Sequence, residues 1–287
     1  MTAPALLGSV VIPAHNEATV ILRCLDTLLV GFRPGELDVT VACNGCTDGT
    51  ADIVRSCGQP VRVVEIDAAS KPAGLRAAED LVTAFPRLYL DADVTLPAAS
   101  ARQVLERLRA GPALAARPPI RYDTECCGPV IRSYFRARAE VPAVMGSLWG
   151  AGVYGLSQAG RARFGRYPDV IAEDLFVDQH FARWEIEIVS SPPVIVSAPR
   201  RTADLLRVMR RIYQGNSENR AIVRRRTRPP ATTPSTLHDL ARLALAEPAR
   251  AADAATYMAL AALARLTVVT AAPARWERDD SSRDEPR

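Results

Sequence analysis

The first hundred residues alternate between short apolar runs and segments of helical periodicity. The apolar runs are rich in strand-forming residues and occupy residues 10–12, 37–43, 61–66 and 86–90. The segments between them have apolar residues at helical spacing or a helix-compatible composition, and occupy residues 18–29, 51–56 and 73–83. Four β–α steps in about ninety residues predict a parallel, doubly wound sheet.

Beyond residue 110 the pattern is less regular. A helix is expected over residues 130–138, and the glycine-rich run at 150–156 either lets the backbone approach a ligand closely or simply turns into a strand. A basic helix over residues 203–214 is expected to end at Gly215. The charged residues 275–287 are expected to be disordered.

Two carboxylates, Asp91 and Asp93, follow the fourth apolar run. In an extended segment, residues two apart project to the same face, so both could reach one divalent cation or its ligands. Oxygen ligands of this kind suit Mg²⁺ or Mn²⁺, and such a cation suits a diphosphate. A solvated strand end is the other interpretation of an Asp-x-Asp sequence.

The other predicted strands also end in polar loops, at the edge where open α/β sheets bind ligands. The first strand runs into residues 13–17 and the second into residues 44–50, which open with an Asn-Gly turn signal. Either Thr47 or Asp48 could cap the next helix, and for Asp48 a capping role is favoured over contact with a nucleotide. Lys71 lies in the loop after the third strand.

The composition indicates a globular protein of mild charge. Of 287 residues, 48% are hydrophobic, which is enough for a sizeable core, and 36 basic residues against 32 acidic ones give a net charge of +4. Clusters of arginine after residue 200 could meet a diphosphate, an anionic acceptor or an acidic membrane surface. They lack the aromatic interleaving that single-stranded nucleic-acid platforms use, so nucleic acid is not an expected partner.

The cysteines and the hydrophobic stretches bear on location. Cys43 and Cys46 form a C-x-x-C sequence, but no second pair lies at zinc spacing, so structural, reduced cysteines are expected. The N-terminus lacks the features of a secretory signal. The apolar stretch at 257–269 is interrupted by Arg265 and predicts a packed helix rather than a membrane-surface one. The predicted location is the cytoplasm, with peripheral contact at the inner face of the plasma membrane left open.

The order of these segments resembles family 2 glycosyltransferases of the GT-A fold. The motifs that carry the resemblance are Val-Ile-Pro-Ala-His-Asn-Glu at 11–17, Asn-Gly-Cys-Thr-Asp-Gly-Thr at 44–50, Lys71, Leu-Asp-Ala-Asp at 90–93 and Glu173-Asp174. The resemblance covers roughly residues 8–220. It implies a nucleotide-diphospho-sugar transferase fold, an α/β architecture with a mainly parallel central sheet flanked by helices.

The resemblance also implies a division of the chain. Residues 1–222 would form the glycosyltransferase domain, with a nucleotide-binding half at 8–110 and an acceptor-binding half at 111–222. A basic, proline-bearing linker at 223–236 would lead to a helical C-terminal extension at 237–287.

The activity implied is a metal-dependent, inverting transfer of a sugar from a nucleotide diphosphate donor to an acceptor hydroxyl, with Mg²⁺ or Mn²⁺ as cofactor. The donor could be UDP-, dTDP- or GDP-linked, and the product a polysaccharide, glycolipid or secondary metabolite. Arg210 and Arg211 lie where relatives carry a basic and aromatic motif near the diphosphate. The Arg-Trp pairing of processive members is missing at that position, which predicts a single addition.

The resemblance assigns donor contacts to the strand-end loops. Pro13, Ala14 and Glu17 would hold the nucleoside. Asn44 stands where the family usually has an Asp that contacts the base, and an amide both donates and accepts, so uracil, thymine and guanine all stay open. Lys71 would face the diphosphate or a neighbouring carboxylate. The family often has Asn at the position of Arg76, which weakens the transfer of detailed donor contacts.

The metal and the base are assigned in the same way. Asp91 would contact the ribose or the metal's water shell, and Asp93 would ligate the metal. His180 could complete the coordination, although residues 174–183 are predicted to be helical and a surface histidine is the competing interpretation. Asp174 is the predicted general base. Its rivals are Glu173 and Asp178, of which Asp178 could equally be an outward-facing charge.

Three other functions compete with this one. A GT-A-like protein could bind a nucleotide sugar without turnover. A nucleotidyltransferase would need a glycine-rich first loop bearing Arg and Lys, which residues 13–17 are not. A nicotinamide oxidoreductase would need G-x-G-x-x-G after the first strand, and this is absent.

Overall fold

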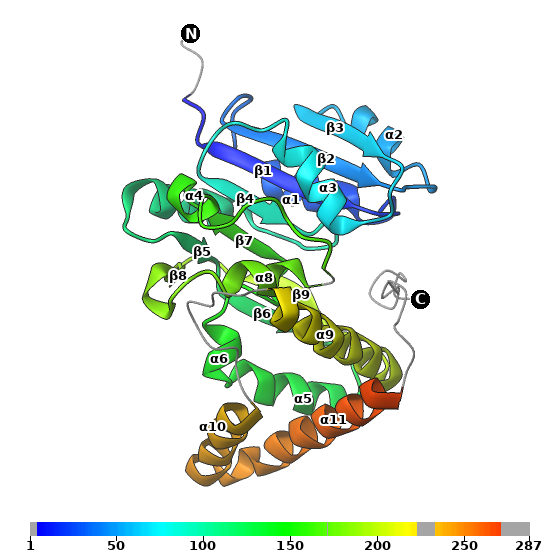
Figure 1. Ribbon diagram of the computed structural model, residues 1–287, viewed down its shortest axis with the longest axis vertical. Helices are drawn as coiled ribbons and strands as arrows, with labels where there is room; N and C mark the ends of the chain where they lie inside the picture. The colour runs from blue at the N-terminus through cyan, green and yellow to red at the C-terminus, as the bar shows by residue number, and fades with distance from the viewer. Residues whose placement is uncertain (1–4, 171, 223–232, 271–287) are drawn as a thin grey trace. The chain divides into compact units, whose positions relative to one another are not determined.

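The computed structural model describes residues 5–170, 172–222 and 233–270 (Figure 1). The chain forms two compact units. Unit 1 consists of Met1–Arg121, Leu148–Asp169 and His180–Ile195, and unit 2 of Tyr122–Ser147, Val170–Gln179 and Val196–Arg287. Most of the predicted linker and the charged C-terminal end lie outside the described residues, and the domain boundaries predicted from the sequence stay a prediction.

Unit 1 contains a seven-stranded sheet in the order β3-β2-β1-β4-β7-β5-β8. Its strands are β1 (Gly8–Ala14), β2 (Leu37–Asn44), β3 (Val61–Ile66), β4 (Arg87–Leu90), β5 (Ala115–Arg117), β7 (Val153–Leu156) and β8 (Ile186–Ile188). The first four strands pair in parallel, and β7 runs antiparallel to both β4 and β5. The mainly parallel sheet predicted from the sequence is confirmed.

Helices connect the parallel strands, as the alternation of the sequence predicts. They are α1 (Ile21–Leu29), α2 (Thr50–Ser56), α3 (Lys71–Glu79) and α4 (Ala98–Ala110), with a short α7 (Gln158–Arg161) and a 3-10 turn at Arg183–Glu185 later in the unit. Helix α1 shows why the pattern works, because Ile21, Leu25, Leu28 and Leu29 recur at helical spacing and are buried, although Leu22 is exposed. Val10, Val11 and Ile12 of the central strand β1 are wholly inaccessible to solvent.

Two further strands, β6 (Ile120–Asp123) and β9 (Val194–Ser197), form a separate two-stranded sheet. The chain passes from one unit to the other within both of these strands. Strand β9 therefore pairs outside the main sheet.

Unit 2 is built from helices. They are α5 (Pro129–Ala139), α6 (Pro142–Met145), α8 (Glu173–Asp178), α9 (Thr202–Ile222), α10 (Thr233–Ala246) and α11 (Ala251–Thr270), with a 3-10 turn at Pro248–Arg250. Helix α11 packs on α5 and α9, and Figure 1 shows α5 beside α11 and α9 converging on one end of α11. The Tyr134 and Tyr257 rings stack with centroids 4.9 Å apart. The packed helix predicted around residues 257–269 is confirmed.

The expected end of the basic helix at Gly215 is wrong, because α9 continues to Ile222. Gly215 instead lies where the helix meets Ala172, and a Cβ added at Gly215 would lie 2.8 Å from the Cβ of Ala172. The glycine therefore serves a close approach between two segments of unit 2 rather than a helix end. Among the described helices, none is long and apolar enough to cross a bilayer.

Candidate active site

The carboxyl ends of β2, β1 and β4 lie at one edge of the sheet in unit 1, because these strands are adjacent and parallel. The polar loops singled out in the sequence follow these three strands. Hydrogen bonds between their side chains and backbone groups hold these loops together.

Asp91 follows the last residue of β4 and forms an ion pair with Lys71. The Lys71 Nζ atom lies 2.6 Å from Asp91 Oδ1, and the two side chains are 28% and 35% exposed. Lys71 is the first residue of α3, so the start of this helix is tied to the end of β4. The neighbouring carboxylate is one of the two partners expected for Lys71, and contact of Lys71 with a diphosphate stays a prediction.

The glycine-rich run packs against this acidic segment. The Asp91 N–H donates to the carbonyl of Gly152 at 2.8 Å. Gly152 has a φ of +64°, and a Cβ there would lie 2.4 Å from Cγ2 of Val94, so no other residue fits this position without displacement. The run turns into strand β7 and packs against the Asp-x-Asp segment, and a close approach to a ligand stays a prediction.

The assumption that Asp91 and Asp93 stand on an extended strand is wrong. β4 ends at Leu90, and the Val94 N–H donates to the Asp91 carbonyl at 3.1 Å, which closes a turn. Strand alternation therefore does not place the two carboxylates on one face. Asp93 is exposed, and its backbone carbonyl accepts a hydrogen bond from Arg23 at 3.5 Å.

The residues present fit a metal only in company with a nucleotide. Within the described ranges, no group of three or more His, Cys, Asp or Glu side chains is arranged to hold an ion. Mg²⁺ and Mn²⁺ are commonly held by one or two carboxylates together with substrate phosphates. Exposed Asp93 suits that arrangement, with Asp91 held beside it by Lys71.

The loops after β1 and β2 are bonded to each other. Oδ1 of Asn16, a residue with φ of 55°, accepts from the Thr47 N–H at 2.7 Å. The Cys46 thiol donates to the Ala14 carbonyl at 3.3 Å and accepts from the Asn16 N–H at 3.4 Å. Burial, and then the adjacent Cys46 thiol, raise the pKa of Cys43 to about 12. All six cysteines are free, as expected.

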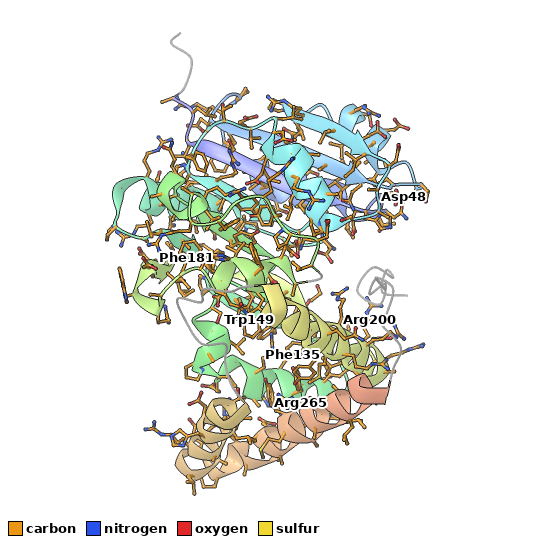
Figure 2. All side chains as sticks on the ribbon, viewed as in Figure 1. Asp48, Phe135, Trp149, Phe181, Arg200 and Arg265 are labelled. Carbon is orange, nitrogen blue, oxygen red and sulfur yellow. The ribbon has the colours of Figure 1, made fainter. Side chains whose placement is uncertain are left out.

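Asp48, labelled in Figure 2, joins the start of α2 to the loop that precedes α1. Its carboxylate accepts from the Thr50 N–H at 3.1 Å and from the Ala18 N–H at 3.0 Å. Burial favours the neutral acid, but the hydrogen bonds from Thr50 and Ala18 outweigh it and hold the pKa of Asp48 below its usual value. The capping role predicted for Asp48 is confirmed, although the formal N-cap residue is Gly49.

Asn44 is 2% exposed and acts as a donor toward the ends of both strands. With its carboxamide oriented so that nitrogen faces the backbone carbonyls, it donates to Ala14 at 2.8 Å and to Ala42 at 3.3 Å. The backbone carbonyl of Asn44 accepts from Nδ1 of His15 at 2.6 Å. This fixes the imidazole tautomer, because a carbonyl only accepts. A Cβ at Gly74 would lie 3.1 Å from the Asn44 carboxamide, so α3 passes close by.

The residues of the first loop that are predicted to hold the nucleoside are buried. Pro13 and Ala14 belong to β1, paired with Ala42 and Cys43 of β2, so part of their backbone is already used in the sheet. Glu17 is 7% exposed, and its N–H donates to Oγ1 of Thr50 at 2.8 Å. Their contacts with a nucleoside stay a prediction.

An ionic cluster beneath the acidic turn was not foreseen. Glu79 accepts from Nε of Arg161 at 2.6 Å, from the Tyr89 hydroxyl at 2.5 Å and from Arg87 at 3.1 Å. Burial favours the neutral acid, but the hydrogen bonds from Arg161 and Tyr89 outweigh it and lower the pKa of Glu79. Tyr89 lies two residues before Asp91, so the cluster anchors the strand that carries the acidic pair.

Arg76 contacts a later segment of unit 1. Its guanidinium donates to the Tyr167 carbonyl at 2.7 Å and to Oδ1 of Asp169 at 2.8 Å. Arg76, at the position where the family often has Asn, therefore holds residues 167–169 against α3.

In unit 2, helix α8 carries the three acids considered as base. Glu173 and Asp178 are 3% and 2% exposed, so the interpretation of Asp178 as an outward-facing charge is wrong. Asp174 is half-buried and accepts from the Leu175 N–H at 2.7 Å. The helix ends at Asp178 instead of continuing to residue 183.

The other predicted residues lie outside α8. His180 belongs to unit 1, is half-buried, and contacts the Phe164 ring at a centroid distance of 5.3 Å. Arg210 and Arg211 are half-buried on α9. Gln179, which the sequence did not single out, is 2% exposed, and neither atom of its amide has a hydrogen-bond partner in the described part of the chain.

Comparison with known proteins gives a family and a fold. Residues 9–148 match the model of the family described as glycosyl transferase family 2. No curated protein sequence matches the chain.

Solved structures match along most of the chain. The mannosyltransferase PcManGT from Pyrobaculum calidifontis, in complex with GDP-Man and Mn²⁺, is 24% identical over 91% of this chain and 78% of its own, with a TM-score of 0.59. Glucosyl-3-phosphoglycerate synthase from Mycobacterium tuberculosis, with Mn²⁺, UDP and glucosyl-3-phosphoglycerate, is 20% identical over 72% and 79%, with a TM-score of 0.52. S. aureus TarS 1–349 with UDP is 15% identical over 95% and 94%, with a TM-score of 0.52. Residues 9–148 therefore match a family 2 glycosyltransferase domain, and the fold of the chain is GT-A.

Proposed function

We propose that this glycosyltransferase is metal-dependent and inverting, and moves a single sugar from a nucleotide diphosphate donor to an acceptor hydroxyl. The observation that carries the proposal is the end of β4, where Asp91 is ion-paired with Lys71 and is followed by exposed Asp93. The mannosyltransferase and the glucosyl-3-phosphoglycerate synthase of the same fold were solved with Mn²⁺ and a nucleotide or nucleotide sugar, which supports this use of the site.

Asp93 and Lys71 have separate tasks in this scheme. Asp93 supplies the protein oxygen for the cation, which when bound neutralises the departing nucleoside diphosphate. Lys71 holds Asp91 in place and adds positive charge beside the diphosphate. Because Asp93 would be almost the sole side-chain ligand, metal affinity should be weak until a nucleotide is present.

Asp174 is the proposed general base. Of the three acids on α8 it is the least buried, so it is the one best placed to accept a proton from an incoming hydroxyl. The hydroxyl oxygen forms the new bond to the anomeric carbon on the face opposite the leaving diphosphate, so the configuration inverts. The donor nucleoside is uridine, thymidine or guanosine.

A thermal-shift comparison of UDP, dTDP and GDP with and without Mn²⁺ tests donor binding. A nucleotide that binds the folded state raises the melting temperature, and Mn²⁺ should enlarge that rise for one nucleotide. Asp93→Asn should abolish the Mn²⁺-dependent part. The matched control is Asp80→Asn, since the Asp80 side chain is 70% exposed and pairs only with Arg166 at the surface. An unchanged Mn²⁺ effect in Asp93→Asn would reject the assignment.

Donor hydrolysis, in which water replaces the acceptor hydroxyl, tests whether the protein turns over and whether Asp174 is the general base. The wild type should release sugar from the matching donor in the presence of Mn²⁺. Asp174→Asn should slow release about 10²- to 10⁴-fold while leaving donor affinity within a few-fold. Tight donor binding with no release and no transfer would favour the alternative, a nucleotide-sugar-binding protein without turnover.

A further inference from the structure

An arginine that the sequence did not single out lies at the acidic turn, residues 91–94. Arg23 belongs to the first turn of α1, and its guanidinium donates to the backbone carbonyl of Asp93, the proposed metal ligand, at 3.5 Å. The next residue, Cys24, is 1% exposed, and its thiol donates to the Asp91 carbonyl at 3.9 Å. Two consecutive residues of α1 therefore contact the backbone of the two acids, and this places the Arg23 side chain beside them.

The acids and Arg23 act on the same buried thiol. Burial raises the pKa of Cys24, and the negative charges of Asp93, Asp91 and Glu17 raise it further, whereas the positive charge of Arg23 lowers it. Electrostatic effects of this kind weaken with distance. The four charged side chains therefore surround one point at the carboxyl edge of the sheet in unit 1.

Arg23 differs from other exposed arginines of unit 1 because it has no carboxylate partner. Arg107 pairs with Glu187 and Arg166 pairs with Asp80. Arg23 is exposed, and it forms no ion pair with any residue that the structure describes. The carbonyl of the turn engages one of its three nitrogens, and a guanidinium has five N–H donors. The remaining donors are open to an anion from solution.

Formal charges indicate which anion. Among the groups that contact the acidic turn or act on Cys24, Glu17, Asp91 and Asp93 are negative and Lys71 is positive. With a divalent cation at Asp93 these groups sum to zero, whereas a nucleotide diphosphate sugar carries one negative charge on each phosphate. Arg23 supplies the net positive charge that attracts such a ligand to this edge.

We propose that Arg23 binds the diphosphate of the donor, beside the cation. The inference rests on the proposed function and adds one side chain to the donor site. A planar guanidinium can donate to two phosphate oxygens at once, which a lysine cannot match. When the bond from the anomeric carbon to the diphosphate breaks, its electron pair stays on the diphosphate oxygen, so the leaving group gains negative charge. Arg23 should therefore bind the transition state more strongly than the intact donor.

Calorimetric titration with UDP, dTDP and GDP in the presence of Mn²⁺ identifies the matching nucleotide and measures its affinity. Arg23→Gln should weaken that affinity about ten-fold, the effect of one charge-assisted hydrogen bond near the surface. Arg23→Lys keeps the charge and should lose less. Arg166→Gln is the matched control, since its side chain is 74% exposed and lies at the surface of the same unit, and it should bind as the wild type does. An unchanged affinity in Arg23→Gln would overturn the proposal.

The corresponding nucleoside monophosphate separates contact with the diphosphate from support of the acidic turn. A direct contact predicts that Arg23→Gln loses more affinity for the diphosphate than for the monophosphate, because the monophosphate offers less negative charge. A displaced turn would instead weaken the Mn²⁺-dependent binding of both alike. Equal losses for the two nucleotides would therefore overturn the proposal and leave Arg23 as a support of the turn.

Donor hydrolysis adds a readout of the transition state. At saturating donor, kcat of Arg23→Gln should fall by a further few-fold, because the charge on the leaving group increases as the bond breaks. A wild type that binds a nucleotide with Mn²⁺ and hydrolyses its sugar conjugate supports the proposed function whatever Arg23→Gln does. A wild type that binds none of the three nucleotides would overturn the proposed function and the role of Arg23 together.

Discussion

The carboxamide of Asn44 donates two hydrogen bonds that a carboxylate at the same position could not donate. It ties Ala14 of β1 and Ala42 of β2 together below the loops. The departure from the Asp usual in the family is thereby explained locally, because in this chain the side chain serves the backbone as a donor. Any contact with a base is left to the carboxamide oxygen and to neighbouring groups such as His15.

Asn44→Asp should destabilise the protein by about 1–3 kcal/mol at pH 7, because two donors are lost and a carboxylate faces carbonyl oxygens. The deficit should shrink as the pH falls and the new acid becomes protonated, since the protonated form can donate again. Urea unfolding at pH 7 and pH 5 measures both effects. Gln103→Glu on α4 makes the same chemical change on a half-exposed helix position and should be nearly neutral.

The carboxylate of Glu79 stabilises the folded protein, whereas the carboxylate introduced by Asn44→Asp would destabilise it. The pKa of Glu79 is lowered in the folded state, so Glu79 binds its proton more readily when unfolded. The stabilisation it gives is present above its unfolded pKa of about 4.5 and is lost as the pH falls through the lower folded value. The difference in unfolding free energy between wild type and Glu79→Gln should therefore be largest near pH 7 and diminish below about pH 4.5. A difference that stays constant from pH 7 to pH 3 would contradict this origin.

At the scale of elements, the sequence predicted what depends on local periodicity. The four β–α steps, the bounds of β3 and the capping role of Asp48 follow from residues close together in the chain. The contacts of Gly152 with Asp91 and of Arg161 with Glu79 join residues far apart in the chain, and no local pattern pairs them. The turn after Leu90 was mistaken for strand because a strand's last residue is fixed by its partners, and here β7 supplies one of them.

Gly152→Ala tests how the glycine-rich run supports the acidic turn. The positive φ and the contact with Val94 both oppose a side chain, so the turn should be displaced and Mn²⁺-dependent nucleotide binding weakened. We expect about 1–3 kcal/mol of destabilisation, the range for a strained backbone position. Gly128→Ala is the control, because a Cβ there meets nothing within 4 Å and its φ of −68° suits alanine. Equal effects of the two substitutions would argue against a specific role for Gly152.

At the scale of the molecule, the loops assigned to the donor lie in unit 1, and the packing of α11 lies in unit 2. The two can therefore be perturbed separately. Tyr257 is 9% exposed and stacks on Tyr134 within unit 2, so its loss leaves a cavity there without touching β1, β2 or β4.

Tyr257→Ala should lower the free energy of unfolding by about 3 kcal/mol, as large-to-small changes of buried aromatic residues do. Nucleotide affinity of the folded fraction should stay within two-fold. Urea unfolding and calorimetric titration with the matching nucleotide measure the two quantities. Met258→Ala, at the neighbouring exposed position, should leave both nearly unchanged, and a loss of affinity in Tyr257→Ala alone would show that donor binding depends on unit 2.

The hydrogen bond from Asp91 to Gly152 also bears on how the protein is made. The acidic turn is translated about sixty residues before the glycine that accepts its N–H. At about 5–20 residues per second, the ribosome takes several seconds to supply that glycine. The parallel strands β1 to β4 can associate in that interval, but the turn reaches its final geometry only after β7 has docked. A nascent chain arrested shortly before residue 150 should therefore already contain the loops after β1 and β2 and still lack the finished acidic turn.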